Sequence, residues 1–286
     1  MLEAPRNYEV VIKPTTGLFR VDLKAVWQYR DLLGLLVHRD FVAKYKQTIL
    51  GPAWFIVQPL LTTLVFSLIF TGVAKIPTDG LPPVLFYMCG LLGWNYFAQT
   101  FTSTSATLVA NAGIFGKVYF PRLVVPLSAV IANMMAFGLQ LATFGAFFGY
   151  YKLFTDSGPT FGLTPAVLWL PLLLVQIGAL SLGVGLWISA LTAKYRDFTF
   201  LTPFIIQLWM YATPIIYPLS KIPQRWHWLA VLNPMAAIVE AFRLMFLGRG
   251  SVVASYAAVS GALTVLVLVT GVLAFNKVEK TFVDTV

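Results

Sequence analysis

Side chains able to do acid–base, nucleophilic or metal chemistry are scarce in this sequence. The two histidines, His38 and His227, lie outside any HExxH or other metal-ligand spacing, so no metal site is expected. The single cysteine, Cys89, lies in an apolar run and permits neither a disulfide framework nor a cysteine-based metal site. No GxxxxGKS or GxxxxGKT phosphate loop is present, so we expect no ATP site of that kind. We therefore predict no catalytic residue, metal or cofactor in this chain.

One pair of charges falls within the apolar part of the sequence. Glu240 is the only acid there, and Arg243 follows one helical turn later. Ionisable residues inside a membrane often mark functional sites. A pair at this spacing can equally form a local salt bridge that neutralises its own cost, which is the interpretation we favour. We predict an intramembrane ion pair.

The scarcity of acids and bases also separates function classes. A proton-coupled transporter normally carries a relay of Asp, Glu or His through its helices. A membrane enzyme of sugar metabolism needs acids, bases or a metal near the membrane surface. Neither set is present. Any transport by this chain would therefore draw its energy from a partner.

Aromatic side chains share helical faces with hydroxyl and amide groups in three apolar segments. Most of the 43 aromatic residues need no explanation beyond the usual membrane-interface belts. Sugar rings, however, present apolar C–H faces and polar edges, which a mixed lining would suit. The candidates for lining a channel are Phe55, Thr62, Phe66, Phe70, Gln207 and Tyr211, with Asn95, Gln99, Thr102 and Ser103 on the second segment.

Residues 211–235 cannot form one continuous helix because they contain four prolines. We expect short re-entrant or interfacial helices on the outer face, where non-helical backbone is tolerated only beside protein or a water-filled cavity. A gate over an exit path and a structural cap both remain open. The candidates for an outer gate are Pro214, Tyr217, Trp226 and Trp228.

Membrane-spanning helices have to position these groups. The chain of 286 residues is 58% hydrophobic and 11% charged, whereas soluble domains carry about 25% charged residues. Six charge-free windows are long enough for the roughly 20 apolar residues of a span. We predict an all-α, polytopic membrane protein with spans near 53–74, 84–107, 123–150, 166–191, 199–218 and 255–276. Gly138, Ala142, Gly145, Ala146 and Gly149 are expected to allow close helix packing in the third span.

The positions of Lys and Arg predict the orientation. Fourteen lie in the N-terminal segment, two alternate loops and the tail, against six on the other side, so both termini should be cytoplasmic. The net charge of +9 follows mostly from this asymmetry, so it does not require a nucleic-acid partner. We expect a cytoplasmic segment at 1–52, a six-span domain at 53–276 and a cytoplasmic tail at 277–286. Nothing near the N-terminus looks like a cleavable signal peptide.

The cytoplasmic segment is expected to end in an amphipathic helix. Its apolar residues recur at three- and four-residue steps: Leu32, Leu35, Leu36, Val42, Tyr45 and Ile49. Such a helix can lie in the membrane interface or pack on the protein's own cytoplasmic face, and the pattern does not choose between them.

Several motifs together resemble the permease subunits of ABC-type polysaccharide exporters. They are Arg39-Asp40, Tyr45-Lys46-Gln47-Thr48-Ile49-Leu50-Gly51, Trp54, Gln58-Pro59, Trp94-Asn95-Tyr96-Phe97, Asn111, Lys117-Val118-Tyr119-Phe120-Pro121-Arg122, Pro126-Leu127-Ser128, Arg196-Asp197-Phe198, Trp209-Met210-Tyr211, Thr213-Pro214, Tyr217-Pro218, Asn233-Pro234-Met235, Glu240 and Phe242-Arg243. The resemblance covers nearly all of the chain from about residue 30. Leu92-Gly93-Trp94 and Val124-Val125-Pro126-Leu127 depart from the usual motifs and leave the subfamily open.

The resemblance implies a homodimer bound to two copies of a cytoplasmic ATPase that holds Mg-ATP, in the cytoplasmic (inner) membrane. It implies export of a lipid-linked polysaccharide such as O antigen, with capsule and teichoic acid as near relatives. The pathway would lie at the dimer interface between the first and fifth spans, closed outside by residues 214–235. The implied residues for coupling to the ATPase are Asn111, Ile114, Phe115, Lys117, Tyr119 and Arg122. The alternatives are a permease of this fold for a drug or lipid and a membrane enzyme of lipid-linked sugar metabolism.

Overall fold

Every regular element in the described part of the chain is a helix, as the sequence predicts. The computed structural model describes residues 23–115, 118 and 120–282. The short helices near the N-terminus are α1 (Leu23–Gln28) and α2 (Arg30–Ala43). The long helices are α3 (Trp54–Phe66, continued by the π-helix η2, Ser67–Val73), α4 (Pro83–Ser105), α7 (Val124–Phe154), α8 (Leu170–Lys194, preceded by η4, Pro165–Trp169), α9 (Phe198–Ala212), α11 (Pro234–Leu247) and α12 (Ala254–Phe282).

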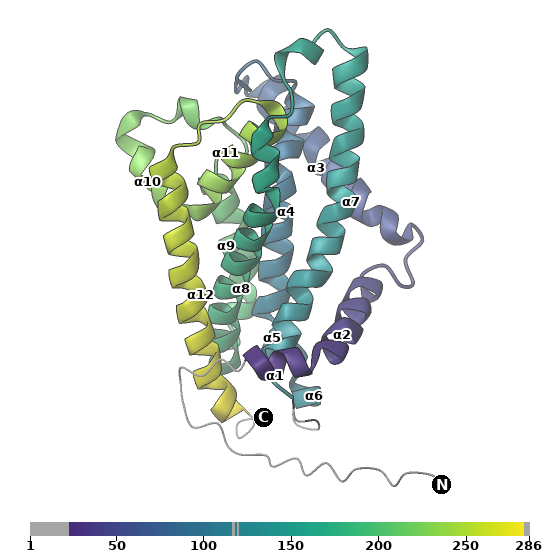
Figure 1. The fold of residues 1–286 in the computed structure, drawn as a ribbon, viewed down its shortest axis with the longest axis vertical. Coiled ribbons are helices and arrows are strands. Elements are labelled where there is room, and N and C mark those ends of the chain that lie inside the picture. The colour runs from purple at the N-terminus through teal and green to yellow at the C-terminus, as the bar shows by residue number, and fades with distance from the viewer. Residues whose placement is uncertain (1–22, 116–117, 119, 283–286) are drawn as a thin grey trace.

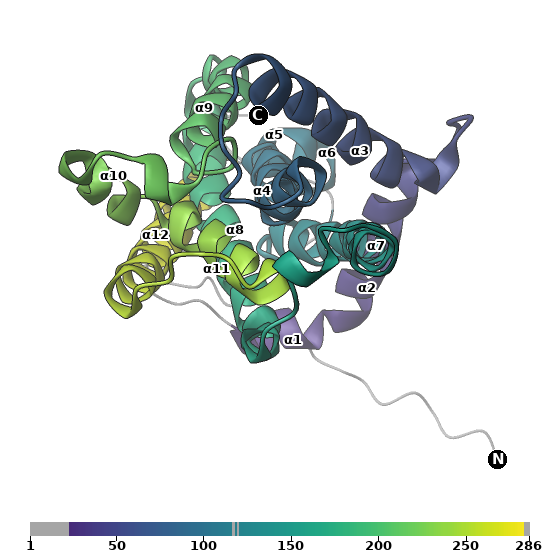
Figure 2. The ribbon, with the colours of Figure 1, turned by 90° about the horizontal axis from the view of Figure 1, so that it is seen from above.

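Helix α4 occupies the centre of the bundle (Figures 1 and 2). It packs against α3, α7, α8, α9 and α11, and most of its 23 residues are buried. Helix α12 packs along α8 on the outside. One end of the bundle, which we call the terminal end, carries α1, α5 (Thr107–Ala110) and α6 (Ala112–Phe115) (Figure 1). The opposite, distal end carries α10 (His227–Leu232) and the 3-10 turns η3 (Gly158–Thr160), η5 (Leu219–Lys221) and η6 (Gln224–Trp226).

Four helices in the described residues are long and apolar enough to cross a membrane: Gly51–Val73, Val124–Phe154, Pro165–Lys194 and Ala254–Glu279. A fifth span results if the segments Gln224–Leu232 and Pro234–Leu247, bent by 99°, are counted as one. Helix α4 is long enough but less apolar, because protein rather than lipid covers most of its surface. Helix α9 has the right apolar character and only 15 residues. The predicted multi-pass helical fold is confirmed, and the count of six spans stays a prediction.

Helices α8 and α12 approach each other closely through glycines, a contact that the sequence analysis did not predict. A Cβ atom on Gly271 would come 2.2 Å from the carbonyl oxygen of Gly183, so both positions need glycine. By contrast, Gly138, Gly145 and Gly149 of α7 have nothing within 4 Å of a Cβ position. The close packing expected around these α7 glycines is therefore absent among the described residues, because α7 turns that face away from its neighbours.

Helix α2 packs against the first half of α7, which favours the second of the two interpretations of the amphipathic helix. Only part of the predicted apolar face of α2 is buried: Leu36 packs against the protein, while Leu35 is 70% exposed. The helix also ends at Ala43, earlier than the apolar pattern suggested, and the chain turns at Gln47, which has a positive φ of 69°.

Candidate functional site

One face of the bundle is left uncovered beside α4. Helices α3 and α9 each pack on α4 and flank it (Figure 2). Only Phe55 and Thr63 are buried on α3, and only Thr202 is buried on α9. We call the surface formed by α3, the exposed side of α4 and α9 the open face. Its apolar side chains suit lipid or another protein, since no other part of the described chain covers them.

A polar groove runs between α3 and α4 on the open face. It has a volume of about 490 Å³, and the polar residues that line it are Lys44, Gln58, Thr62, Asn95, Gln99, Thr102 and Ser103. Thr62 Oγ1 donates to the carbonyl of Gln58 at 3.0 Å, and Thr102 Oγ1 donates to that of Ala98 at 2.8 Å, which leaves their lone pairs free as acceptors. In the described part of the chain, the side-chain amides of Gln58 and Gln99 have no hydrogen-bond partner. The groove therefore offers donors and acceptors beside an apolar wall, a combination suited to sugars.

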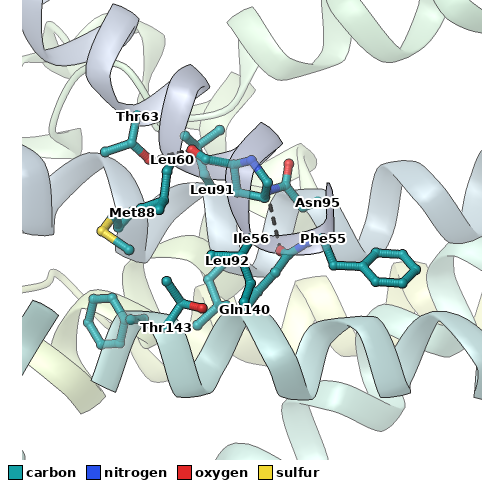
Figure 3. Close-up of a pocket in the computed structure, with 12 residues that line it drawn as sticks. Phe55, Ile56, Leu60, Thr63, Met88, Leu91, Leu92, Asn95, Gln140 and Thr143 are labelled. Carbon is teal, nitrogen blue, oxygen red and sulfur yellow. Dashed lines mark hydrogen bonds between the residues drawn. The ribbon is translucent and has the colours of Figure 1, made fainter. Parts of the chain in front are cut away.

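Beneath this groove, α3 leans on α4 and α7 (Figure 3). Asn95 Nδ2 donates to Gln140 Oε1 at 3.4 Å and so links α4 to α7. Thr63 Oγ1 donates to the carbonyl of Pro59 at 2.8 Å, within α3. Apolar side chains such as Leu91 and Met88 fill most of the remaining space. The floor of the groove is thus closed by packed side chains.

The residues predicted to line a channel have different surroundings. Thr62 lines the groove together with Gln99. Phe55 is turned inward, with 9% of its surface exposed, and stacks on Phe41 with ring centroids 5.5 Å apart. Phe55 therefore joins α3 to α2, and the part of its surface that remains lines the groove. The other two aromatic candidates of this segment, Phe66 and Phe70, pack edge to face with ring centroids 5.2 Å apart.

The remaining channel candidates lie on the opposite flank of the open face. Gln207 and Tyr211 are exposed on α9. Helix α9 is held to α4 by Trp209, whose ring lies 4.9 Å from that of Phe97. The candidates of α3 and those of α9 thus share one face of the molecule without forming one cavity.

At the distal end, a cavity of about 640 Å³ lies between the end of α9 and the helices η6 and α10. Of the gate candidates, Tyr217 and Trp226 line it, together with Trp209 and Lys221. The Tyr217 hydroxyl donates to the carbonyl of Tyr211 at 3.1 Å. The other two candidates lie outside the cavity: Pro214 is buried, and Trp228 is 56% exposed.

Asn233 holds this distal segment in place. Its Oδ1 accepts from Trp209 Nε1 at 2.9 Å and from the backbone N–H of Met235 at 3.1 Å, which caps α11. Its Nδ2 donates to the carbonyl of Ala212 at 3.1 Å and to Thr213 Oγ1 at 3.0 Å. All four of its hydrogen-bonding positions are used, so Asn233 ties the end of α9 to the start of α11.

Glu240 and Arg243 form a buried ion pair in α11, with Nη1 and Oε1 2.8 Å apart. Arg243 Nη2 also donates to the carbonyl of Ile215 at 3.0 Å, and the guanidinium lies 3.8 Å from the ring centroid of Phe86. Glu240 Oε2 accepts from the backbone N–H of Ser251 at 2.9 Å. The pair therefore fastens three separate segments to α11, which is a structural role.

The short helices at the terminal end contain the residues implied for coupling. Ile114 is 41% exposed, whereas Phe115 is buried against Phe120 with ring centroids 5.8 Å apart. Arg122 stacks on Phe115 and pairs with Glu279 of α12, its Nε lying 3.7 Å from Oε1. Asn111 Nδ2 donates to the carbonyl of Thr107 at 3.0 Å. Lys117 and Tyr119 lie outside the described residues.

A cluster that we did not select from the sequence lies where α2 meets α7. Lys44 donates through Nζ to Asn133 Oδ1, and Ser128 Oγ donates to Asp40 Oδ2 at 3.0 Å. Arg39 Nη2 lies 2.8 Å from Asp40 Oδ1. The signals in the sequence were the motifs that contain Arg39-Asp40 and Ser128, and the polar character of Ser128 and Asn133 within an apolar span.

The fold and its surfaces define a multi-pass helical membrane protein. Across the parts of the chain that the structure describes, there is no group of three or more His, Cys, Asp or Glu able to hold a metal ion. Residues 31–247 match the model of the ABC-2 type transporter family. The chain belongs to this family.

Curated relatives match over most of their length. The chain is 28% identical to an O-antigen export system permease protein RfbA of Klebsiella pneumoniae, over 89% of this chain and 94% of the relative. It is 30% identical to the protein of that name from Myxococcus xanthus, over 78% and 83%. It is 24% identical to the polysialic acid transport protein KpsM of Escherichia coli, over 72% and 77%.

Proposed function

We propose that this chain is the membrane subunit of an ATP-driven exporter that moves a lipid-linked polysaccharide, O antigen in the first place, across the cytoplasmic membrane. The observation that supports this most is the near full-length similarity to permeases named for O-antigen export. The polar groove of the open face agrees with it, because free amides and hydroxyls beside apolar side chains suit a sugar polymer.

In this proposal two copies of the chain join through their open faces, and the polymer passes between α3 of one copy and α9 of the other. The exposed apolar residues of both helices would then be covered by the partner or by lipid. The distal segment around Tyr217 and Trp226 closes the pathway on the outside. Both termini lie in the cytoplasm, where positive charges gather.

Energy comes from two copies of an ATPase that hold Mg-ATP and dock at the terminal end. Ile114 and the exposed part of α6 present the docking surface. Phe115 and Arg122 support this docking surface, because their stacking and the Arg122–Glu279 pair hold α6 against α12. ATP-driven movement of the docked ATPase would reach α4 and α7 directly, because α5 and α6 lie in the link between them.

The test is purification from native membranes in mild detergent, followed by mass spectrometry and an ATPase assay. We expect a stoichiometric phosphate-loop ATPase with activity, and loss of surface polysaccharide when the chain is deleted. A homo-oligomer without nucleotide hydrolysis under equally gentle extraction would contradict the proposal and favour a membrane enzyme.

The similarity to a polysialic acid transport protein supports capsule export as the second candidate. Analysis of the surface polymer separates the two, because O antigen is lost from lipopolysaccharide in one case and capsule is lost in the other. Loss of a small lipid or of drug resistance, with both polymers intact, would instead indicate the alternative permease class.

A further inference from the structure

Lys44, at the end of α2, is a cation without a carboxylate of its own. Among the residues that the structure describes, it forms no ion pair. Its ammonium reaches inward to Asn133 Oδ1 on α7, although much of its stem is exposed. Desolvation lowers the pKa of Lys44, and the charge of Asp40 opposes this shift. Asp40 itself is already engaged by Arg39 and Ser128.

Asn133, which contacts Lys44, has a side-chain N–H donor without an acceptor. Its side chain is almost fully buried, with 1% of its surface exposed. Its Oδ1 accepts from Lys44, which fixes the amide orientation because an ammonium can only donate. Its Nδ2 has no hydrogen-bond partner in the described part of the protein. Buried donors are rarely left without an acceptor, so Asn133 Nδ2 can donate to a ligand that enters beside Lys44.

A cavity joins these groups to the groove of the open face. It has a volume of about 270 Å³, and its polar lining consists of Arg39, Asp40, Lys44, Ser103, Thr107, Asn111 and Asn133. Lys44 and Ser103 line the α3–α4 groove as well. A ligand with its charged end at Lys44 can therefore continue along the groove past Gln99 and Thr62.

We propose that Lys44, Asn133 and Arg39 bind the phosphate group of the lipid-linked substrate, at the cytoplasmic end of the groove that takes its sugars. This inference builds on the export function proposed above. A phosphate oxygen would accept from Asn133 Nδ2, and its negative charge would supply the counterion that Lys44 lacks. Asp40 does not repel it strongly, because Arg39 and Ser128 hold that carboxylate.

The competing interpretation is that Lys44 only fastens α2 to α7. Asn133→Asp separates the two, since it changes shape very little and gives Lys44 an internal carboxylate. If the contact is only structural, this variant keeps or strengthens it. If the site binds phosphate, the new negative charge repels the ligand and removes the Nδ2 donor.

The experiment measures equilibrium binding of a radiolabelled long-chain polyprenyl diphosphate to the purified complex in nanodiscs of phosphatidylcholine. We expect Lys44→Gln and Asn133→Asp each to weaken binding about tenfold or more. Asn133→Asp should keep the thermal midpoint of the wild type, and Lys44→Arg should retain most of the binding. Lys46→Gln, an equal loss of charge at an exposed neighbour, is the matched control and should bind as the wild type does.

Unlabelled competitors identify the source of the phosphate. Polyprenyl diphosphate should compete, whereas the polyprenol without phosphate, inorganic pyrophosphate and phosphatidylglycerol should compete weakly. Equal competition by any of these three would overturn the assignment to the lipid-linked substrate. Unchanged binding by Lys44→Gln and Asn133→Asp in an exporter that still works would overturn the site and leave the export function standing. Absence of export by the wild type would count against the function instead.

Discussion

Helices α3 and α4 are neighbours, but they differ greatly in how much of their surface the rest of the chain buries. Most of the 23 residues of α4 are buried, whereas only two of the 13 residues of α3 are. Yet α3 is the more apolar of the two and qualifies as a membrane span by composition, while α4 does not. Helix α4 can contain polar residues because protein surrounds it. Helix α3 is apolar although the rest of the described chain leaves most of its surface uncovered, as expected of a helix in contact with lipid.

This difference divides the molecule into two parts with different tolerances. The core around α4, α8 and α11 is held by buried contacts such as the Glu240–Arg243 pair and the Gly183–Gly271 approach. On the open face, α3 and α9 bury few side chains within the described chain, and the side-chain amides of Gln58 and Gln99 line the groove between α3 and α4. We expect substitutions in the core to change stability and substitutions on the open face to change export. The following predictions test this division.

The largest effect is expected in the core, at Arg243. Arg243→Met leaves Glu240 buried without its partner, so the free energy of unfolding should fall by about 3–5 kcal/mol. Thermal unfolding in detergent measures it. Adding Glu240→Gln should recover part of the loss because it removes the uncompensated charge. Arg249→Gln, an exposed arginine nearby, is the control, and equal effects at both arginines would contradict the prediction.

The next effect tests close packing between α8 and α12. Gly271→Val should destabilise the protein by about 1–3 kcal/mol, because a Cβ atom there would come 2.2 Å from the carbonyl oxygen of Gly183. Gly145→Ala on α7 is the control, since its Cβ would meet nothing within 4 Å. Both variants are compared by thermal midpoint. A shift at Gly145 as large as that at Gly271 would mean that α7 packs closely against something else.

On the open face, Gln99→Leu should reduce export about fivefold while the stability changes by less than about 0.5 kcal/mol. The reason is that Gln99 lines the groove and its side-chain amide has no hydrogen-bond partner in the described part of the protein. Polymer export and the thermal midpoint are measured in parallel. Ser255→Leu, an exposed polar-to-leucine change on α12, is the control. A large loss of stability at Gln99 would place it in the core instead.

The smallest effects are expected at the distal cavity. Tyr217→Phe removes one exposed hydrogen bond to the carbonyl of Tyr211 and should lower the free energy of unfolding by about 0.5 kcal/mol. Tyr217→Ala and Trp226→Ala should alter export while the ATPase still copurifies, because the cavity lies at the end opposite to α6 (Figure 1). Loss of the ATPase in these two variants would refute a role as an outer gate.

Several elements of the fold could be predicted from the sequence because they depend on local composition. All six apolar windows form helices, and the four prolines of residues 211–235 break the chain into short helices as expected. The ion pair followed from the spacing of Glu240 and Arg243 on one helix. The family followed from motifs spread along the chain, and the match over residues 31–247 agrees with them.

The buried face of each helix could not be predicted. The sequence did not show that the rings of Phe55 and Phe115 are largely buried, and their roles in a channel and in docking stay predictions. The α7 glycines looked suited to close packing, and the close packing occurs at Gly183 and Gly271. In a soluble protein, the contrast between apolar and polar faces marks the buried side of a helix. In a membrane, the lipid-facing side is apolar too, so this contrast is lost.

The sequence by itself therefore determined that the chain crosses the membrane as helices, because backbone hydrogen bonding and hydropathy act over about 20 neighbouring residues. Only the tertiary structure decided which side chains meet. Lys44 and Asn133 are 89 residues apart, and Asp79 and Ser220 are 141 apart, yet each pair forms hydrogen bonds. Such contacts depend on how whole helices rotate and tilt against one another, and no local pattern contains that information.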